Sequence, residues 1–139
     1  MKTFLLAYAG AALAFLLGDM LWLSGPMARH YQAWIGPLLL PEPRLVPAAL
    51  FYLSYVLGIV VFGVLPGLRD GGWRRSAGLS ALFGLLAYGT YDLSNLATLR
   101  DWPVQLALVD MAWGTGLSCC AGCTGFAFAR TWGRAARAR

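Results

Sequence analysis

The sequence predicts an all-α membrane protein, with four transmembrane helices in a compact bundle and a short interfacial helix between the first and second. Of the 139 residues, 59% are hydrophobic and only 12% are charged, whereas a soluble domain carries about 25% charged residues. The mean hydropathy of +0.62 agrees with this composition. Four separate stretches also reach the ~20 apolar residues that a helix needs to cross a bilayer.

The four predicted spans belong to one transmembrane domain, residues 1–139, and cover residues 3–24, 46–66, 77–98 and 104–128. Pro47 and Pro103 lie near helix starts, where a missing N–H costs little, and Asp101 is a candidate N-cap for the fourth helix. Pro66-Gly67 is expected to end the second helix. The first stretch is too long for the apolar core of a signal peptide, so we interpret it as a span.

The segment over residues 25–45 is too short and too rich in proline to cross a bilayer. Its apolar and aromatic residues recur at helical spacing, which favours a short helix lying in the outer interface. Such a helix would cover one end of the bundle. The candidate lid residues are Arg29, His30, Tyr31 and Trp34.

Basic residues predict the orientation of the chain, because they collect on the cytoplasmic side. Three arginines, Arg29, Arg44 and Arg100, would lie outside. With the N-terminus inside, the other eight are cytoplasmic: Lys2, Arg69, Arg74, Arg75, Arg130, Arg134, Arg137 and Arg139. Both termini are therefore expected in the cytoplasm. The basic tail over residues 129–139 is interpreted as an anchor to anionic lipid and not as a nucleic-acid arm.

Three carboxylates fall inside the predicted spans, at similar depth. At 1.5 Å per residue, Asp19, Asp92 and Asp110 lie roughly 7–12 Å below the outer interface, and the second span brings Tyr52 and Tyr55 to the same level. An ionised side chain in a bilayer costs several kcal/mol, so it normally faces the bundle interior. The sequence therefore predicts a polar layer in the outer half of the bundle.

Helical spacing adds neighbours to this layer. Tyr88, Asp92 and Asn95 share one face of the third span. The segments GDMLW (18–22) and VDMAW (109–113) repeat an aspartate followed by a tryptophan three residues later. The predicted ligand-binding or buried polar network is Asp19, Trp22, Tyr52, Tyr55, Tyr88, Tyr91, Asp92, Asn95, Asp110 and Trp113.

This network has three interpretations: hydrogen bonding that holds the helices together, a ligand pocket open to the outer side, or a proton or metal site. No His or Glu spacing supports metal, so no metal or cofactor is predicted. Gly114, Ser118 and Gly122, spaced by four, are interpreted as a small-residue packing stripe, to which Cys119, Cys120 and Cys123 belong. No known catalytic motif is present.

Four segments resemble the small bacterial membrane proteins grouped as domain-of-unknown-function family 2177. They are YDLSNLATLRDWP (91–103), LVDMAWGT (108–115), GDMLWL (18–23) and LFYLSYVLGIVVF (50–62). The resemblance extends over essentially the whole chain. It implies a bacterial inner-membrane location and a four-span fold, and it brings no activity or catalytic residue.

The favoured hypothesis is a non-enzymatic protein that binds a lipid or other hydrophobic ligand, or an accessory subunit of a larger membrane complex. Its expected partners are membrane lipids and a larger complex or a second copy, without nucleic acid. One alternative is an integral membrane enzyme that acts on a lipid through Asp92, with Asp19 or Asp110 as its partner. Another is a proton-coupled carrier that works as an oligomer.

Overall fold

The computed structural model describes residues 1–135, and all regular structure in that range is helical. The elements are α1 (Lys2–Ser24), α2 (Pro26–Ile35), η1 (Gly36–Leu38), α3 (Leu45–Gly58), η2 (Ile59–Val64), η3 (Gly67–Gly71), α4 (Gly72–Thr98) and α5 (Val104–Ala135). The all-α prediction is confirmed. Three helical stretches are long and apolar enough to cross a membrane: Lys2–Ser24, Leu45–Thr98 and Val104–Gly133.

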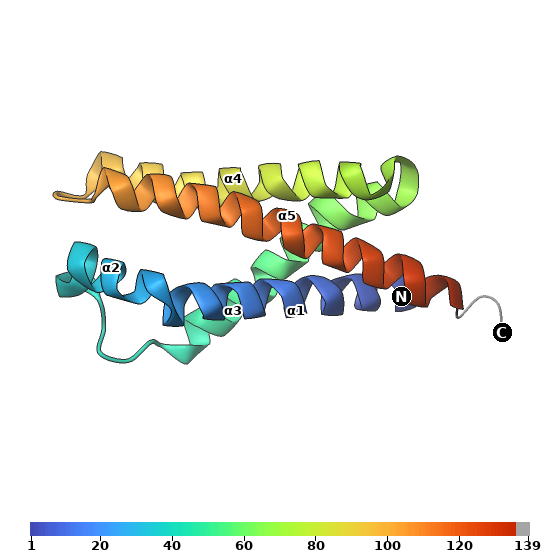
Figure 1. Ribbon diagram of the computed structural model, residues 1–139, viewed down its shortest axis with the longest axis horizontal. Coiled ribbons are helices and arrows are strands. Elements are labelled where there is room, and N and C mark those ends of the chain that lie inside the picture. Colours follow the sequence, from blue (N-terminus) through green and yellow to red (C-terminus); the bar gives the residue numbers. More distant parts are fainter. Residues whose placement is uncertain (136–139) are drawn as a thin grey trace.

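The long helices α1, α4 and α5 form the body of the molecule (Figure 1). Helix α5 lies between the other two and packs extensively on both. Both termini and the turn before α4 lie at one end, and α2 lies at the other end with the turn between α4 and α5 (Figure 1). Helix α3 packs against α1, and within the described residues its backbone comes near α4 and α5 at very few points, so it meets them through long side chains such as Tyr55.

The 54-residue stretch Leu45–Thr98 contains a reversal of direction at Gly72. Gly72 has φ +68°, a conformation that glycine adopts without the steric cost of a Cβ. The expectation that Pro66-Gly67 ends the second helix is wrong, because the helical path continues to Gly71. Proline lacks an N–H and crowds the carbonyl four residues earlier. Two π-helical segments, η2 and η3, flank Pro66, and their wider turns fit around it.

Two other boundaries differ from the sequence predictions. Asp101 is not an N-cap; it has φ +64° and lies in the turn between α4 and α5. The first hydrogen bond of α5 runs instead from the Ala107 N–H to the Pro103 carbonyl, at 3.2 Å. Helix α5 continues past residue 128 to Ala135, so the start of the basic tail is helical. The end of that tail, with Arg137 and Arg139, lies outside the described residues.

Small residues bring α4 and α5 close together. The Ser76 hydroxyl donates a hydrogen bond to the Gly122 carbonyl at 3.1 Å, and a Cβ placed on Gly122 would lie 2.5 Å from Ser80 Cβ. A Cβ on Gly84 would lie 2.7 Å from Ser118 Cβ. The predicted stripe of Gly114, Ser118 and Gly122 therefore faces α4 directly, as in the close helix packing of membrane proteins.

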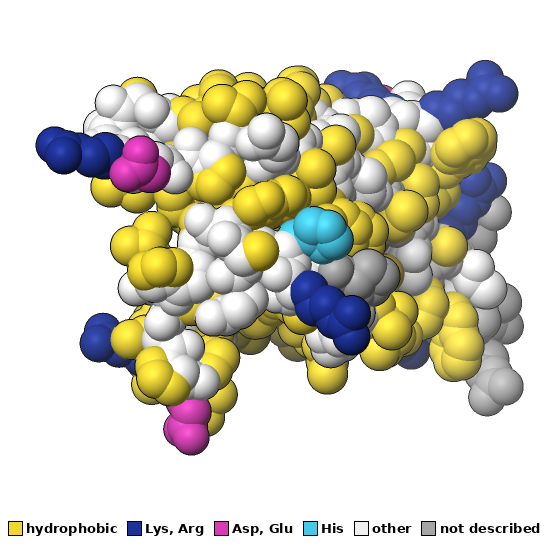
Figure 2. Space-filling view, turned by 60° about the vertical axis from the view of Figure 1, so that its left-hand side comes forward, with side chains coloured by type: hydrophobic (Ala, Val, Ile, Leu, Met, Phe, Trp, Pro, Cys, Tyr) yellow, Lys and Arg dark blue, Asp and Glu magenta, His cyan; other side chains and the backbone are white. Residues whose placement is uncertain are grey.

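Large apolar side chains cover the outside of this bundle. Leu86 and Phe62 are each 61% exposed, and Leu50 is 63% exposed. Figure 2 shows hydrophobic side chains over much of one face, with few acidic groups at its margins. Because water does not stabilise such a surface, the outside fits a hydrocarbon environment.

Candidate functional site

Three carboxylates from three helices are buried inside the bundle. Asp19 of α1 is 7% exposed, Asp110 of α5 is 6% exposed, and Asp92 of α4 is fully buried. Asp110 lies close enough to both of the others for their charges to interact. The structure thus brings Asp19, Asp92 and Asp110 into one polar layer, which we call the carboxylate layer. Such a layer is expected where neighbouring helices run in opposite directions.

Two tyrosines donate hydrogen bonds to this layer. The Tyr52 hydroxyl of α3 donates to Asp19 Oδ2, and the Tyr31 hydroxyl of α2 donates to Asp110 Oδ1. Burial and the bond to the carboxylate raise the pKa of Tyr31 above its ordinary value, so the phenol keeps its proton. Tyr31, expected only as part of a lid, therefore ties α2 to the layer.

Asp92 differs from the other two carboxylates because nothing in the described part of the chain hydrogen-bonds to either of its oxygens. The Trp102 indole lies beside it, and the Trp102 N–H also lacks a partner of good geometry among the described residues. A buried carboxyl without partners is costly. Asp92 is therefore the carboxyl of the layer whose hydrogen-bonding capacity is least satisfied.

The two tryptophans of the repeated Asp-x-x-Trp segments stack on each other. The rings of Trp22 and Trp113 are 4.1 Å apart between centroids and 6° from parallel. Trp113 also lies beside Asp19. The stack joins α1 to α5 next to the carboxylate layer, a cross-helix pair that the sequence spacing does not reveal.

Two further tyrosines extend the network toward the centre of the bundle. The hydroxyls of Tyr55 and Ser118 are hydrogen-bonded at 2.9 Å. The Tyr88 ring meets the Tyr55 ring edge-on, with centroids 5.9 Å apart. Sequence reasoning assigned Ser118 to packing alone and missed this bond. The available signal was a hydroxyl group inside an apolar span, which needs a hydrogen-bond partner.

The remaining predicted residues lie at the edge of this network. Tyr91 is 53% exposed and contacts Trp102 edge-on at 5.7 Å. Asn95 is half-buried one turn beyond Tyr91. On α2, Arg29 and His30 are exposed, with the His30 ring 5.3 Å from the Trp34 ring. Trp34 itself packs on a small apolar cluster formed by Ile35, Trp102 and Leu106.

A cavity of about 420 Å³ lies against the carboxylate layer, between α3 on one side and α4 and α5 on the other. Its lining is four aromatic rings, one alanine and one carboxylate: Phe51, Tyr55, Ala87, Tyr88, Tyr91 and Asp110. We call it the aromatic cavity. Its volume lies in the range of ~300–1,000 Å³ that is typical of small-molecule sites. Asp92 does not line it.

Sequence reasoning missed two lining residues, Phe51 and Ala87. Phe51 lies four residues before Tyr55 on α3, and the two rings are 5.3 Å apart. That helical spacing could have placed Phe51 on the same face. Ala87 carries no signal in the sequence, because its role is to leave space.

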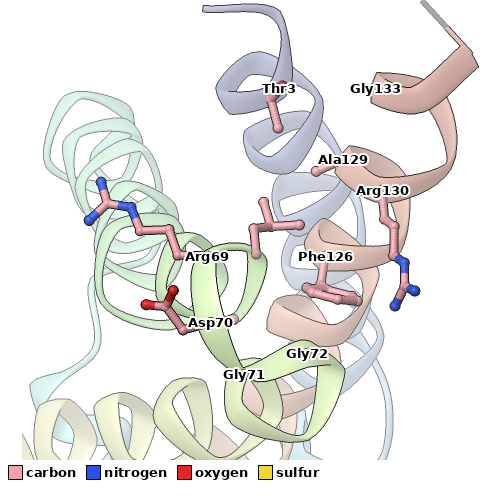
Figure 3. Close-up of a pocket in the computed structure, with 11 residues that line it drawn as sticks. Thr3, Arg69, Asp70, Gly71, Gly72, Phe126, Ala129, Arg130 and Gly133 are labelled. Atoms are coloured by element: carbon pink, nitrogen blue, oxygen red, sulfur yellow. The ribbon is translucent and has the colours of Figure 1, made fainter. Parts of the chain in front are cut away.

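A second cavity, of about 390 Å³, lies at the end that carries the termini. Thr3 of α1, Arg69 of η3 and Arg130 of α5 contribute to its walls (Figure 3). The two arginine side chains extend away from each other, and Asp70 lies beside Arg69 (Figure 3). The guanidinium groups therefore do not converge on a common anion.

Neither metal binding nor cysteine chemistry gains support from the geometry. Among residues 1–135, no group of three or more His, Cys, Asp or Glu side chains could hold a metal ion. Cys119, Cys120 and Cys123 are free thiols, and Cys120 faces outward. The candidate site is thus the carboxylate layer together with the aromatic cavity.

Comparison with known proteins gives a family and no activity. No curated protein and no solved structure matches the chain. A family model described as a predicted membrane protein, DUF2177, matches residues 4–127. This match covers most of the 139 residues and includes every residue of the carboxylate layer and the aromatic cavity. The chain therefore belongs to the DUF2177 family of membrane proteins, a family of unknown function.

Proposed function

We propose that the chain crosses a bacterial inner membrane four times, with both termini in the cytoplasm. The reversal at Gly72 divides the 54-residue stretch into α4, of 27 residues, and an equally long first half. At 1.5 Å per residue each half extends about 40 Å, more than the ~30 Å of a hydrocarbon core. The excess of basic residues at the end with the termini supports the orientation. In this arrangement α2 lies in the outer interface.

We further propose that the protein binds a lipid or another hydrophobic ligand in the aromatic cavity. One observation carries this proposal: an aromatic-lined space of about 420 Å³ lies beside a buried carboxylate layer, where the backbone of α3 stays apart from α4 and α5. Apolar walls with few polar groups are typical of small-molecule sites. The apolar part of a ligand would contact the rings, and a polar end would meet Asp110.

No observation in this geometry supports the enzyme alternative. A lipid substrate in the aromatic cavity would meet Asp110, whereas Asp92 is fully buried and does not line the wall. The Asp110 carboxylate already accepts a hydrogen bond from Tyr31. These contacts suit holding a ligand better than exchanging a proton with it.

The test fills the cavity and asks whether a ligand is lost. A fatty alcohol that carries a photoreactive diazirine is crosslinked to the purified protein in nanodiscs, and the labelled peptides are mapped by mass spectrometry. Ala87→Phe places a ring in the cavity, while Ala97→Phe adds the same ring at an exposed position of the same helix. We expect labelling of peptides with Phe51 and Tyr88, abolished in Ala87→Phe and retained in Ala97→Phe.

Equal labelling of both variants would refute ligand binding in the aromatic cavity. Native mass spectrometry of the same samples reports the alternative role as an accessory subunit. A stable homo-oligomer or a co-purifying protein, together with absent cavity labelling, would favour that role.

A further inference from the structure

We propose that the aromatic cavity is selective for a lipophilic organic cation, a molecule with a positively charged ammonium group and a hydrocarbon part. This inference rests on the proposed function, namely that the cavity binds a hydrophobic ligand, and it assigns the charge of that ligand. Three independent features of the described residues lead to it: the charge balance of the layer, the chemistry of the walls and the unused bonding capacity of the carboxylates.

The carboxylate layer contains acidic groups without basic groups to balance their charge. Asp19, Asp92 and Asp110 lie in the predicted spans, which contain no lysine, arginine or histidine. Asp110 interacts with the charges of both other carboxylates. A buried carboxylate is normally stabilised by a cationic partner. The spans supply none, so a cation from outside the chain would balance the layer.

The walls of the cavity are suited to the same charge. Phe51, Tyr55, Tyr88 and Tyr91 line the space together with Asp110. The negative faces of aromatic rings attract ammonium groups, and clusters of such rings are the usual site for quaternary ammonium ligands. The four rings come from α3 and α4, so they line the space from two sides.

The carboxylates also retain bonding capacity. The hydrogen bond from Tyr31 goes to Asp110 Oδ1, and Oδ2 takes no part in that bond. Both oxygens of Asp92 lack partners among residues 1–135, but Asp92 does not line the cavity, so Asp110 is the carboxylate that a ligand would meet. A carboxylate or phosphate on the ligand would be repelled by Asp110, and a neutral alcohol would leave the charge of the layer uncompensated. A metal ion would find aromatic carbon where it needs oxygen ligands.

The experiment compares three competitors that differ only in their end group, two of which have the same shape and differ in charge. Each carries the same twelve-carbon chain and ends in trimethylammonium, in its uncharged carbon isostere tert-butyl, or in sulfonate. Each competes with the photoreactive fatty alcohol for the full-length protein in nanodiscs. We expect the trimethylammonium compound to displace the alcohol at a concentration at least tenfold lower than the tert-butyl compound. The sulfonate should be the weakest.

Two variants locate this preference. Asp110→Asn keeps an oxygen acceptor for Tyr31 and removes the charge, so the ammonium and tert-butyl compounds should compete within twofold of each other. Asp101→Asn removes a charge from an exposed turn at the same end, where asparagine tolerates the φ of +64°, and should keep the full preference.

The outcomes separate this inference from the proposed function. If the tert-butyl or sulfonate compound competes as well as the ammonium compound, the inference is wrong while the cavity still binds ligand. If none of the three competes while the alcohol still labels the cavity, the inference is wrong; if the alcohol does not label the cavity, the proposed function itself fails. A preference that survives in Asp110→Asn would also overturn the inference. The ranking in the unmodified protein decides the question even if Asp110→Asn does not fold.

Discussion

Replacing Gly84 with alanine tests the close approach of α4 and α5, on which the carboxylate layer depends. The added Cβ would lie 2.7 Å from Ser118 Cβ and would also collide with the Gly114 carbonyl oxygen. A backbone atom cannot rotate out of the way, so the two helices must separate. Overpacking of this kind costs about 1–3 kcal/mol, while replacing glycine by alanine in a helix contributes about 1 kcal/mol in favour of folding.

The net effect of Gly84→Ala is therefore a loss of about 0–2 kcal/mol in the free energy of unfolding. Gly78→Ala is the matched control, because Gly78 lies on the same helix and a Cβ there meets no atom within 4 Å. It should stabilise the protein by about 1 kcal/mol. Reversible unfolding in mixed micelles, followed by tryptophan fluorescence, measures both. The reasoning is refuted if Gly84→Ala proves as stable as Gly78→Ala.

Two further predictions concern the hydrogen bonds of the carboxylate layer. Tyr52→Phe removes the donor to the buried Asp19 and should lower the free energy of unfolding by about 1–3 kcal/mol. The control, Tyr8→Phe, loses a 3.0 Å hydrogen bond to a backbone carbonyl and should lower it by only about 0.6 kcal/mol in the same unfolding assay. Equal losses would contradict the assignment. Tyr31→Phe frees α2 from Asp110, so its amides should exchange with deuterium roughly fivefold faster, whereas unchanged exchange would show that this bond does not hold α2.

The helical content follows from hydropathy, whereas the helix boundaries do not. Apolar stretches of sufficient length predict helices because a bilayer leaves the backbone no other partner than itself. Proline and aspartate are weaker indicators, since their effect depends on the conformation around them. Pro66 was expected to stop a helix, and two π-helical segments accommodate it. Asp101 was expected to cap α5, and it occupies the left-handed region in the preceding turn.

Part of the candidate site can likewise be predicted from the sequence, and part cannot. The cost of a charge in hydrocarbon predicts that Asp19, Asp92 and Asp110 face inward, and all three are buried. Their hydrogen-bond partners depend on how each helix is rotated and how the connecting segments fold back. Tyr31 reaches Asp110 only because α2 lies at the same end of the bundle as the turn between α4 and α5. No periodicity within a single helix contains that information.

The aromatic cavity is partly open and lies where the backbone of α3 stays apart from α4. In the proposed four-span arrangement such an opening would face the acyl chains, so a molecule would enter by diffusing within the plane of the membrane. Its occupancy then follows the mole fraction of the molecule in the lipid phase rather than its concentration in water. Extra detergent dilutes that phase and would empty the cavity even when the total amount of the molecule stays constant.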